Sequence, residues 1–205
     1  PLAAKPVEQV RKVLGYNERM SSLDAPLDRD GGVSIGDGLA DPEGYLARLA
    51  EAMGLKLAQG RGHKVLRLEA KPSFANLAVW KVLYETDERF YVDAVKPGIF
   101  QPLVWQGDNI RKLDMKRDFP WLDPASQQAL DIERFSLSSA GYLAVDPKDN
   151  RRIGDIRYSM LPQKIAPLWG IQLSPTAGAD GHVAFYTLRD DARVAVRRLA
   201  YMVFE

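Results

Sequence analysis

Apolar residues recur at helical spacing in several parts of the chain. Residues 6–15 form a short amphipathic pattern that begins at a proline and ends at a glycine, which predicts a short helix. A longer apolar stripe over residues 43–59 ends at a glycine-rich turn, and residues 192–204 carry a similar stripe. A further helix is predicted over residues 126–136, because Ser126 is a suitable N-cap in front of its apolar positions.

Strands are expected where β-branched and aromatic residues cluster between turn residues. These segments are residues 65–72, 76–86, 89–95, 142–145, 153–159, 169–173 and 182–188. Short polar turns join most neighbours, so the strands should form a mainly antiparallel sheet with helices packed on one face, which is an α+β fold. Residues 99–125 are expected to be an irregular loop that is held in place by Phe119, Trp121 and Leu122.

A break in composition divides the chain near Asp41. Residues 21–43 contain six acidic side chains and no aromatic residue, which is typical of an extended or mobile linker. We therefore predict that residues 1–43 form a flexible leader, a short helix followed by an acidic linker, and that residues 44–205 form the folded domain. The leader carries five Lys/Arg against eight Asp/Glu, and the rest of the chain carries 23 against 19.

Composition excludes several classes of protein. Basic side chains alternate with acidic ones instead of lining one face, so direct binding to nucleic acid is not expected. The absence of cysteine excludes disulfides, zinc–thiolate sites and thiol nucleophiles. The apolar runs are far shorter than the roughly 18 residues of a membrane-spanning helix, so the chain as given is expected to be soluble. The absence of cysteine suits a reducing compartment, so a cytoplasmic location is expected. It begins with Pro-Leu-Ala-Ala and no methionine or signal peptide, which indicates a fragment of a longer protein.

Three charged residues are the candidates for a functional site. Asp155 and Arg157 lie two positions apart in a predicted strand and should share one face of the sheet, and Asp93 alternates with apolar positions in another strand. A carboxylate beside a guanidinium can bind a polar ligand, although such pairs are more often structural ion pairs. As a hypothesis, the face that bears these three side chains is where a polar ligand or partner would sit.

No other constellation supports a particular chemistry. His63 and His182 stand alone among non-ligating residues, so no metal site is predicted. Ser136, Ser138 and Ser139 have no histidine nearby in the sequence and lie in no nucleophile-elbow motif, which makes a serine hydrolase a weak interpretation. No cofactor-binding motif is identifiable, and whether the chain is an enzyme stays open.

The leader resembles a known family. The matching strings are Pro6-Val-Glu-Gln-Val-Arg-Lys-Val-Leu-Gly-Tyr-Asn-Glu-Arg-Met-Ser-Ser-Leu-Asp-Ala-Pro-Leu-Asp28 and Ser34-Ile-Gly-Asp-Gly-Leu-Ala-Asp41. They resemble the end of region 3 and the linker toward region 4 of bacterial sigma factors of the stationary-phase type. The resemblance implies that residues 6–43 could contact RNA polymerase, in the active cleft and exit channel. The promoter-reading regions 2 and 4 of that family have no counterpart in this sequence.

Residues 45–190 resemble a different family, through several motifs in matching order. These are Arg61-Gly-His-Lys64, Leu68-Glu-Ala-Lys-Pro-Ser-Phe74, Asn76-Leu-Ala-Val-Trp80, Phe90-Tyr-Val-Asp-Ala-Val95, Asp118-Phe-Pro-Trp-Leu-Asp123, Gly154-Asp-Ile-Arg-Tyr-Ser-Met-Leu-Pro162 and Leu168-Trp-Gly-Ile171. They look like the soluble C-terminal domain of bacterial inner-membrane metal-dependent hydrolases, a family also described as LexA-binding.

This second resemblance implies a function that depends on another part of the protein. In the family, a membrane-spanning N-terminal half carries the His and Asp residues expected to hold a divalent metal, and full-length members reside in the inner membrane. The domain over residues 44–205 is therefore expected to act beside that half in cis and not to be catalytic alone. Two alternatives stay open: a transcription module whose leader contacts RNA polymerase, and a fusion of two segments that have no joint function.

Overall fold

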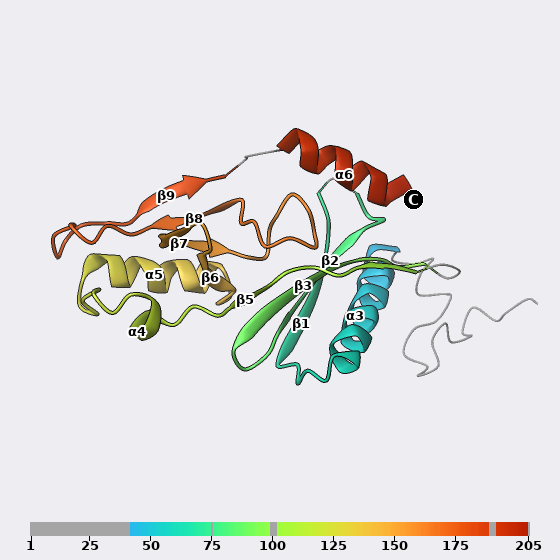
Figure 1. Ribbon diagram of the computed structural model, residues 1–205, viewed down its shortest axis with the longest axis horizontal. Coiled ribbons are helices and arrows are strands. Elements are labelled where there is room, and N and C mark those ends of the chain that lie inside the picture. The colour runs from blue at the N-terminus through green and yellow to red at the C-terminus, as the bar shows by residue number, and fades with distance from the viewer. Residues whose placement is uncertain (1–41, 75, 99–101, 189–191, 205) are drawn as a thin grey trace, which may run out of the picture. The chain divides into compact units, whose positions relative to one another are not determined.

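The computed structural model describes residues 42–74, 76–98, 102–188 and 192–204 (Figure 1). The chain divides into two compact units, Pro1–Tyr45 and Leu46–Glu205. The short helix predicted at residues 6–15 and almost all of the predicted linker at 21–43 lie outside the described residues. The described residues therefore belong to the second unit, together with the first turn of the helix that begins at Pro42.

The first sheet contains the strands from the first half of this unit. It consists of β1 (Arg67–Pro72), β2 (Trp80–Glu85), β3 (Arg89–Lys96) and β4 (Leu103–Trp105), in that order, and β5 (Asn109–Arg111) pairs with another part of β3. All of these pairings are antiparallel. Two short strands thus replace part of the irregular loop that the sequence predicted at residues 99–125.

The second sheet contains the remaining strands in sequence order. It consists of β6 (Leu143–Asp146), β7 (Asp149–Asp155), β8 (Trp169–Gln172) and β9 (Ala184–Thr187), again all antiparallel. The predicted α+β class is confirmed, but the described strands form two sheets where the sequence pattern was interpreted as one. Helices lie between β5 and β6 in the chain, and the N–H of Leu113, just after β5, donates to the backbone oxygen of Leu143 in β6.

Each sheet is covered by a helix, as Figure 1 shows. The helix α3 (Pro42–Gly60) runs along the first sheet, and α5 (Gln127–Ser138) runs along the second, where it follows the single turn of α4 (Met115–Asp118). The start of α5 agrees with the prediction, because Ser126 Oγ accepts the N–H of Ala129 at 3.4 Å. The last helix is α6 (Ala192–Phe204).

The contact between α3 and the first sheet is close. Ala50 of the helix packs with Trp80, Val82 and Val95 of the sheet, all of them buried. Gly54 lies at the closest point, where a Cβ atom would come within 2.3 Å of Val82 Cγ1. A side chain at residue 54 would therefore push the helix and the sheet apart.

Several predicted boundaries shift for local reasons. β2 begins at Trp80 and not at Asn76, because the Asn76 side-chain oxygen accepts the N–H groups of Ala78 and Val79 and so forms a turn. β7 ends at Asp155, where the chain turns, instead of continuing to residue 159. In the segment before α5, Phe119 is buried as expected, whereas Trp121 is 42% exposed and does not serve as an anchor.

The two sheets share one hydrophobic core. Leu83, Phe90 and Val92 of the first sheet pack with Tyr142, Ala144 and Ile156 at the second. The rings of Phe90 and Tyr142 lie 5.4 Å apart, within the range of a favourable aromatic pair. Full burial of a large apolar side chain contributes about 1.5–3 kcal/mol, so this cluster joins the sheets strongly. Among the described helices, none is long and apolar enough to cross a membrane.

Candidate functional site

Asp93 is held from two directions in the interior of the first sheet. The carboxylate is buried in β3 and accepts two hydrogen bonds from Arg61, at 2.6 and 2.9 Å, in a bidentate ion pair. The N–H of Gly107 donates a third hydrogen bond at 2.9 Å. These contacts connect the turn after α3 with β3 and with the chain after β4, which makes Asp93 an anchor between three segments.

Asp155 and Arg157 form an ion pair with each other. Arg157 donates through Nε and Nη2 to the two carboxylate oxygens, at 2.9 and 2.7 Å, and Asp155 is buried. The hydrogen bond to Asp155 holds the pKa of Arg157 above its ordinary value. Arg157 Nη2 also donates to the backbone oxygen of Ser138, at the end of α5. The geometry matches the structural interpretation that the sequence favoured for this pair.

The three candidates do not share a face. Asp93 lies opposite Val82 in the β2–β3 pairing, and Val82 packs against α3. Lys81, the next residue along β2, therefore points to the other side of the sheet, and its charge interacts with that of Asp155. The hypothesis of one ligand-binding face formed by Asp93 together with the Asp155–Arg157 pair is wrong.

Both histidines are engaged with a neighbouring side chain. His63 Nδ1 lies 2.9 Å from the hydroxyl of Tyr84, and its ring lies 4.4 Å from that of Tyr91. His182 Nδ1 lies 2.8 Å from the Asp131 carboxylate at the surface. Within the part of the chain that the structure describes, no group of three or more His, Asp or Glu side chains could hold a metal ion.

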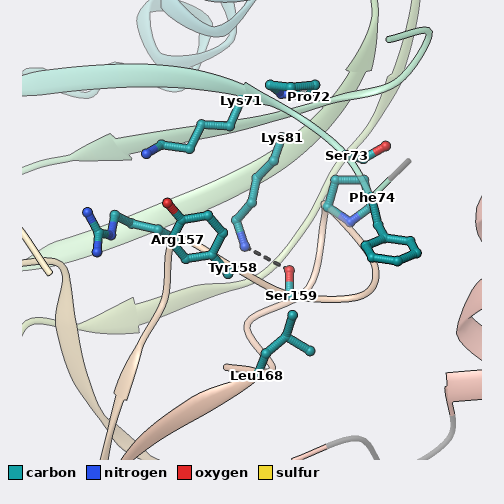
Figure 2. Close-up of a pocket in the computed structure, with 10 residues that line it drawn as sticks. Lys71, Pro72, Ser73, Phe74, Lys81, Arg157, Tyr158, Ser159 and Leu168 are labelled. Carbon is teal, nitrogen blue, oxygen red and sulfur yellow. Dashed lines mark hydrogen bonds between the residues drawn. The ribbon is translucent and has the colours of Figure 1, made fainter. Parts of the chain in front are cut away.

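The most unusual side chain in the described residues is Lys81. All six residues of β2 are buried, and Lys81 is only 4% exposed although lysine is rarely found inside proteins. Its Nζ donates to Ser159 Oγ at 2.9 Å (Figure 2) and to the backbone oxygen of Lys164 at 3.2 Å. No carboxylate of the described residues forms an ion pair with it.

Burial changes the acid–base behaviour of Lys81. Loss of hydration disfavours the ammonium form and lowers the pKa of Lys81 to about 7, although the charges of Asp155 and Asp108 act in the opposite direction. A lysine with this pKa is present in both protonation states near neutral pH. It can therefore accept and return a proton, which an ordinary surface lysine does not do at that pH.

Lys81 and Ser159 open onto a small cavity (Figure 2). The cavity has a volume of about 120 Å³ and is lined by residues 71–74, by Lys81, by residues 157–159, and by Pro162 and Leu168. The ring of Tyr158 lies against Trp169 at 4.8 Å and below the Lys71 ammonium at 5.3 Å, which supports one wall. Apolar and polar groups thus converge on one space, as in small ligand sites.

The segment that carries Ser159 is fixed by hydrogen bonds. Ser159 Oγ donates to the backbone oxygen of Leu161 at 2.7 Å. Farther along, Asp108 accepts from Lys164 Nζ at 2.8 Å and from the N–H of Ile165 at 3.1 Å, and its own N–H donates to Gln163. The serine hydroxyl therefore occupies a defined position relative to Lys81.

Sequence reasoning missed both members of this pair. A signal for Lys81 was present, because a single charge interrupts the apolar run Trp80-Lys-Val-Leu-Tyr84 and such a charge in a buried strand requires an explanation. Ser159 carries no comparable signal, since it stands at the end of the predicted strand 153–159 and belongs to no nucleophile motif. Only the fold brings together these two residues, which are 78 positions apart.

Comparison of the chain with protein-family models, with curated proteins and with solved structures finds no match.

Proposed function

We propose that residues 44–205 are the soluble accessory domain of a membrane-bound, metal-dependent hydrolase-family protein. In this proposal the domain acts beside a membrane-spanning half that holds the divalent metal, in the inner membrane, and does not perform the metal-dependent reaction alone. The basis is the ordered set of motifs that resembles the C-terminal part of that family.

The observation that carries the proposal is the way in which separate motifs meet in the fold. Arg61, in the first matching motif, forms the bidentate ion pair with Asp93, in a motif that lies 32 positions later. Phe74 and Ser159 belong to two further motifs and line the same cavity. The residues that carry the resemblance thus make contacts that hold one domain together, as expected if they define a folding unit.

The charged residues in these motifs favour an accessory role over a metal-binding one. Asp93 accepts hydrogen bonds from Arg61 and Gly107, and both oxygens of Asp155 are engaged by Arg157. A carboxylate saturated in this way is a poor metal ligand, because binding would require it to give up an existing ion pair.

The test is binding to a membrane half. A membrane-spanning half of a bacterial member of this hydrolase family is immobilised in detergent, and binding of the 205-residue chain is measured by biolayer interferometry. A version that lacks residues 1–41 and core RNA polymerase as a second immobilised partner complete the comparison. The expected result is binding to the membrane half that is equal with and without residues 1–41.

The other outcomes are equally informative. Failure of both versions to bind the membrane half contradicts the accessory role. Binding to RNA polymerase that is seen only with the leader present supports the alternative, a transcription module that contacts the polymerase through residues 6–43. Equal binding of the two versions to the polymerase rejects that alternative.

A further inference from the structure

We propose that Ser159 and Lys81 form a serine–lysine pair that transfers a small acyl group from an ester to water, with Ser159 as the nucleophile and Lys81 as the general base. This activity is separate from the accessory role proposed above and needs no metal. The reaction would take place in the cavity that Lys81 and Ser159 line (Figure 2).

The geometry places nucleophile and base in direct contact. Lys81 Nζ and Ser159 Oγ lie 2.9 Å apart, within reach for a proton transfer. The third partner is the backbone oxygen of Lys164, which accepts from Lys81 and orients its amine. A base that is oriented by another group and contacts a hydroxyl is the arrangement by which weak oxygen nucleophiles are activated, including serine–lysine variants.

The two side chains differ in exposure in the way that the reaction requires. Ser159 is half-buried and lines the cavity, so a substrate can approach its hydroxyl. Lys81 reaches the same cavity from inside the sheet and is nearly inaccessible. Its burial favours the neutral amine, which has the lone pair needed to accept a proton.

The proposed reaction has two balanced stages. In the resting structure the Ser159 hydroxyl donates to the backbone oxygen of Leu161, so it first turns its proton toward the neutral amine of Lys81. The proton then moves to Lys81 Nζ as the serine oxygen forms a bond to the ester carbonyl carbon, and the carbonyl electron pair moves onto its oxygen. When that intermediate collapses, the bond from carbon to the leaving oxygen breaks, and Lys81 gives its proton to the leaving alcohol. Water then attacks the acyl-serine by the same route, which releases the acid and restores the hydroxyl of Ser159 and the neutral Lys81.

The size of the cavity limits the acyl group. Sites for drug-sized ligands occupy about 300–1,000 Å³. This cavity, with about 120 Å³, is smaller than such sites. A short acyl group such as acetyl therefore suits this space best.

The experiment uses 4-nitrophenyl acetate, a small activated ester, with the 205-residue chain. Release of nitrophenolate is followed over time, and the acetylated residue is located by peptide mass spectrometry after rapid acid quenching. We expect a hydroxylamine-sensitive ester on Ser159, and a rate that rises between pH 6 and pH 8 as Lys81 loses its proton. Ser159→Ala and Lys81→Met should each lower the rate by about 100-fold, the usual contribution of general-base catalysis.

Matched controls separate this chemistry from chance acetylation. Ser138→Ala removes an exposed hydroxyl at the end of α5, and Lys56→Met removes an exposed amine on α3, so both should react like the unsubstituted chain. Ser159→Ala deletes a half-buried hydroxyl and should fold, which circular dichroism checks. An unchanged rate in Ser159→Ala, or stable acetylation of Lys81 in place of Ser159, overturns the proposal. Loss of binding to a membrane half would leave this result unaffected.

Discussion

Two buried charges on the same face of β2 are stabilised in different ways. Glu85 lies on one side of Leu83 and receives ion pairs from Arg67 and Lys112. Burial opposes the ionisation of Glu85, but the hydrogen bonds from those two cations outweigh it and lower the pKa of the carboxyl. Lys81, on the other side of Leu83, has only neutral oxygen atoms as hydrogen-bond partners. Its charged form is therefore the less stable of the two.

Charges from several elements surround Lys81. The carboxylates of Asp155, at the end of β7, and Asp108, just before β5, favour its ammonium form. Lys71 lies opposite it in the β1–β2 pairing, and Arg157 lines the same cavity. These two cations are themselves paired, Lys71 with Glu69 and Arg157 with Asp155, so burial dominates the balance.

We expect the Lys81→Met substitution to change how stability depends on pH. The pKa of Lys81 is about 7 in the folded chain, against 10.5 for an unperturbed lysine, so the unfolded chain binds more protons between these values. The free energy of unfolding of the unsubstituted chain therefore increases as pH rises from 7 to 10.5. Methionine does not titrate, so the Lys81→Met variant lacks this increase. The stability of Lys81→Met relative to the unsubstituted chain should be greatest near pH 6 and decrease by on the order of 4 kcal/mol by pH 10.

Urea denaturation at several pH values measures this difference. The exposed Lys56→Met variant is the control and should give a curve parallel to that of the unsubstituted chain. Comparing differences between variants also removes the titration of other groups. If the Lys81→Met curve were parallel as well, Lys81 would not be neutral in the folded chain at neutral pH.

At the level of the elements, two glycines of α3 offer a matched comparison. Alanine normally stabilises a helix by about 1 kcal/mol relative to glycine. At Gly60, where a Cβ would meet no atom within 4 Å, we expect Gly60→Ala to be neutral or stabilising by up to about that amount. At Gly54 the Cβ would meet Val82 Cγ1 at 2.3 Å, so Gly54→Ala should destabilise the fold by about 1–3 kcal/mol. Thermal unfolding of the two variants tests the packing of α3, and equal effects would contradict it.

Local sequence patterns predict some helices and strands correctly and miss others. The helices predicted at residues 43–59 and 126–136 agree with α3 and α5, because a long apolar stripe and a serine N-cap act within a few residues. The start of β2 was missed because the side chain of Asn76 competes with the strand for backbone hydrogen bonds. β4 and β5 are three residues each and have no period to detect, since their partner β3 determines them.

At the level of the whole molecule, the core between the sheets should make them unfold together. Phe90 belongs to the first sheet, is buried, and packs on Tyr142 next to the second. Phe90→Ala should cost about 3–5 kcal/mol, and amide protection in β2 and in β8 should fall by the same amount in hydrogen exchange. Phe185→Ala, at a side chain that is 67% exposed, should cost less than about 1 kcal/mol. Retained protection in β8 of the Phe90→Ala variant would mean that the sheets are independent.

The arrangement of the two sheets explains why the candidate site could not be derived from the sequence. The predicted grouping of Asp93 with Asp155 assumed one sheet, and the strands that carry them belong to two sheets. The pairing of Lys81 with Ser159 depends on how these sheets meet, which no local period encodes. Ion pairs between near neighbours, such as Asp155 with Arg157, are the contacts that sequence spacing does predict.

The ion pair between Arg61 and Asp93 has a consequence for the order of folding. It joins residues 32 positions apart, and the same carboxylate also accepts the N–H of Gly107, so all three contacts exist only after α3, the β2–β3 hairpin and the chain beyond β4 have come together. We therefore expect these contacts to form after the main folding barrier, which φ-value analysis of an Arg61 substitution would test. Loss of the Arg61 side chain should therefore speed unfolding far more than it slows folding, so this pair governs how long the folded domain persists.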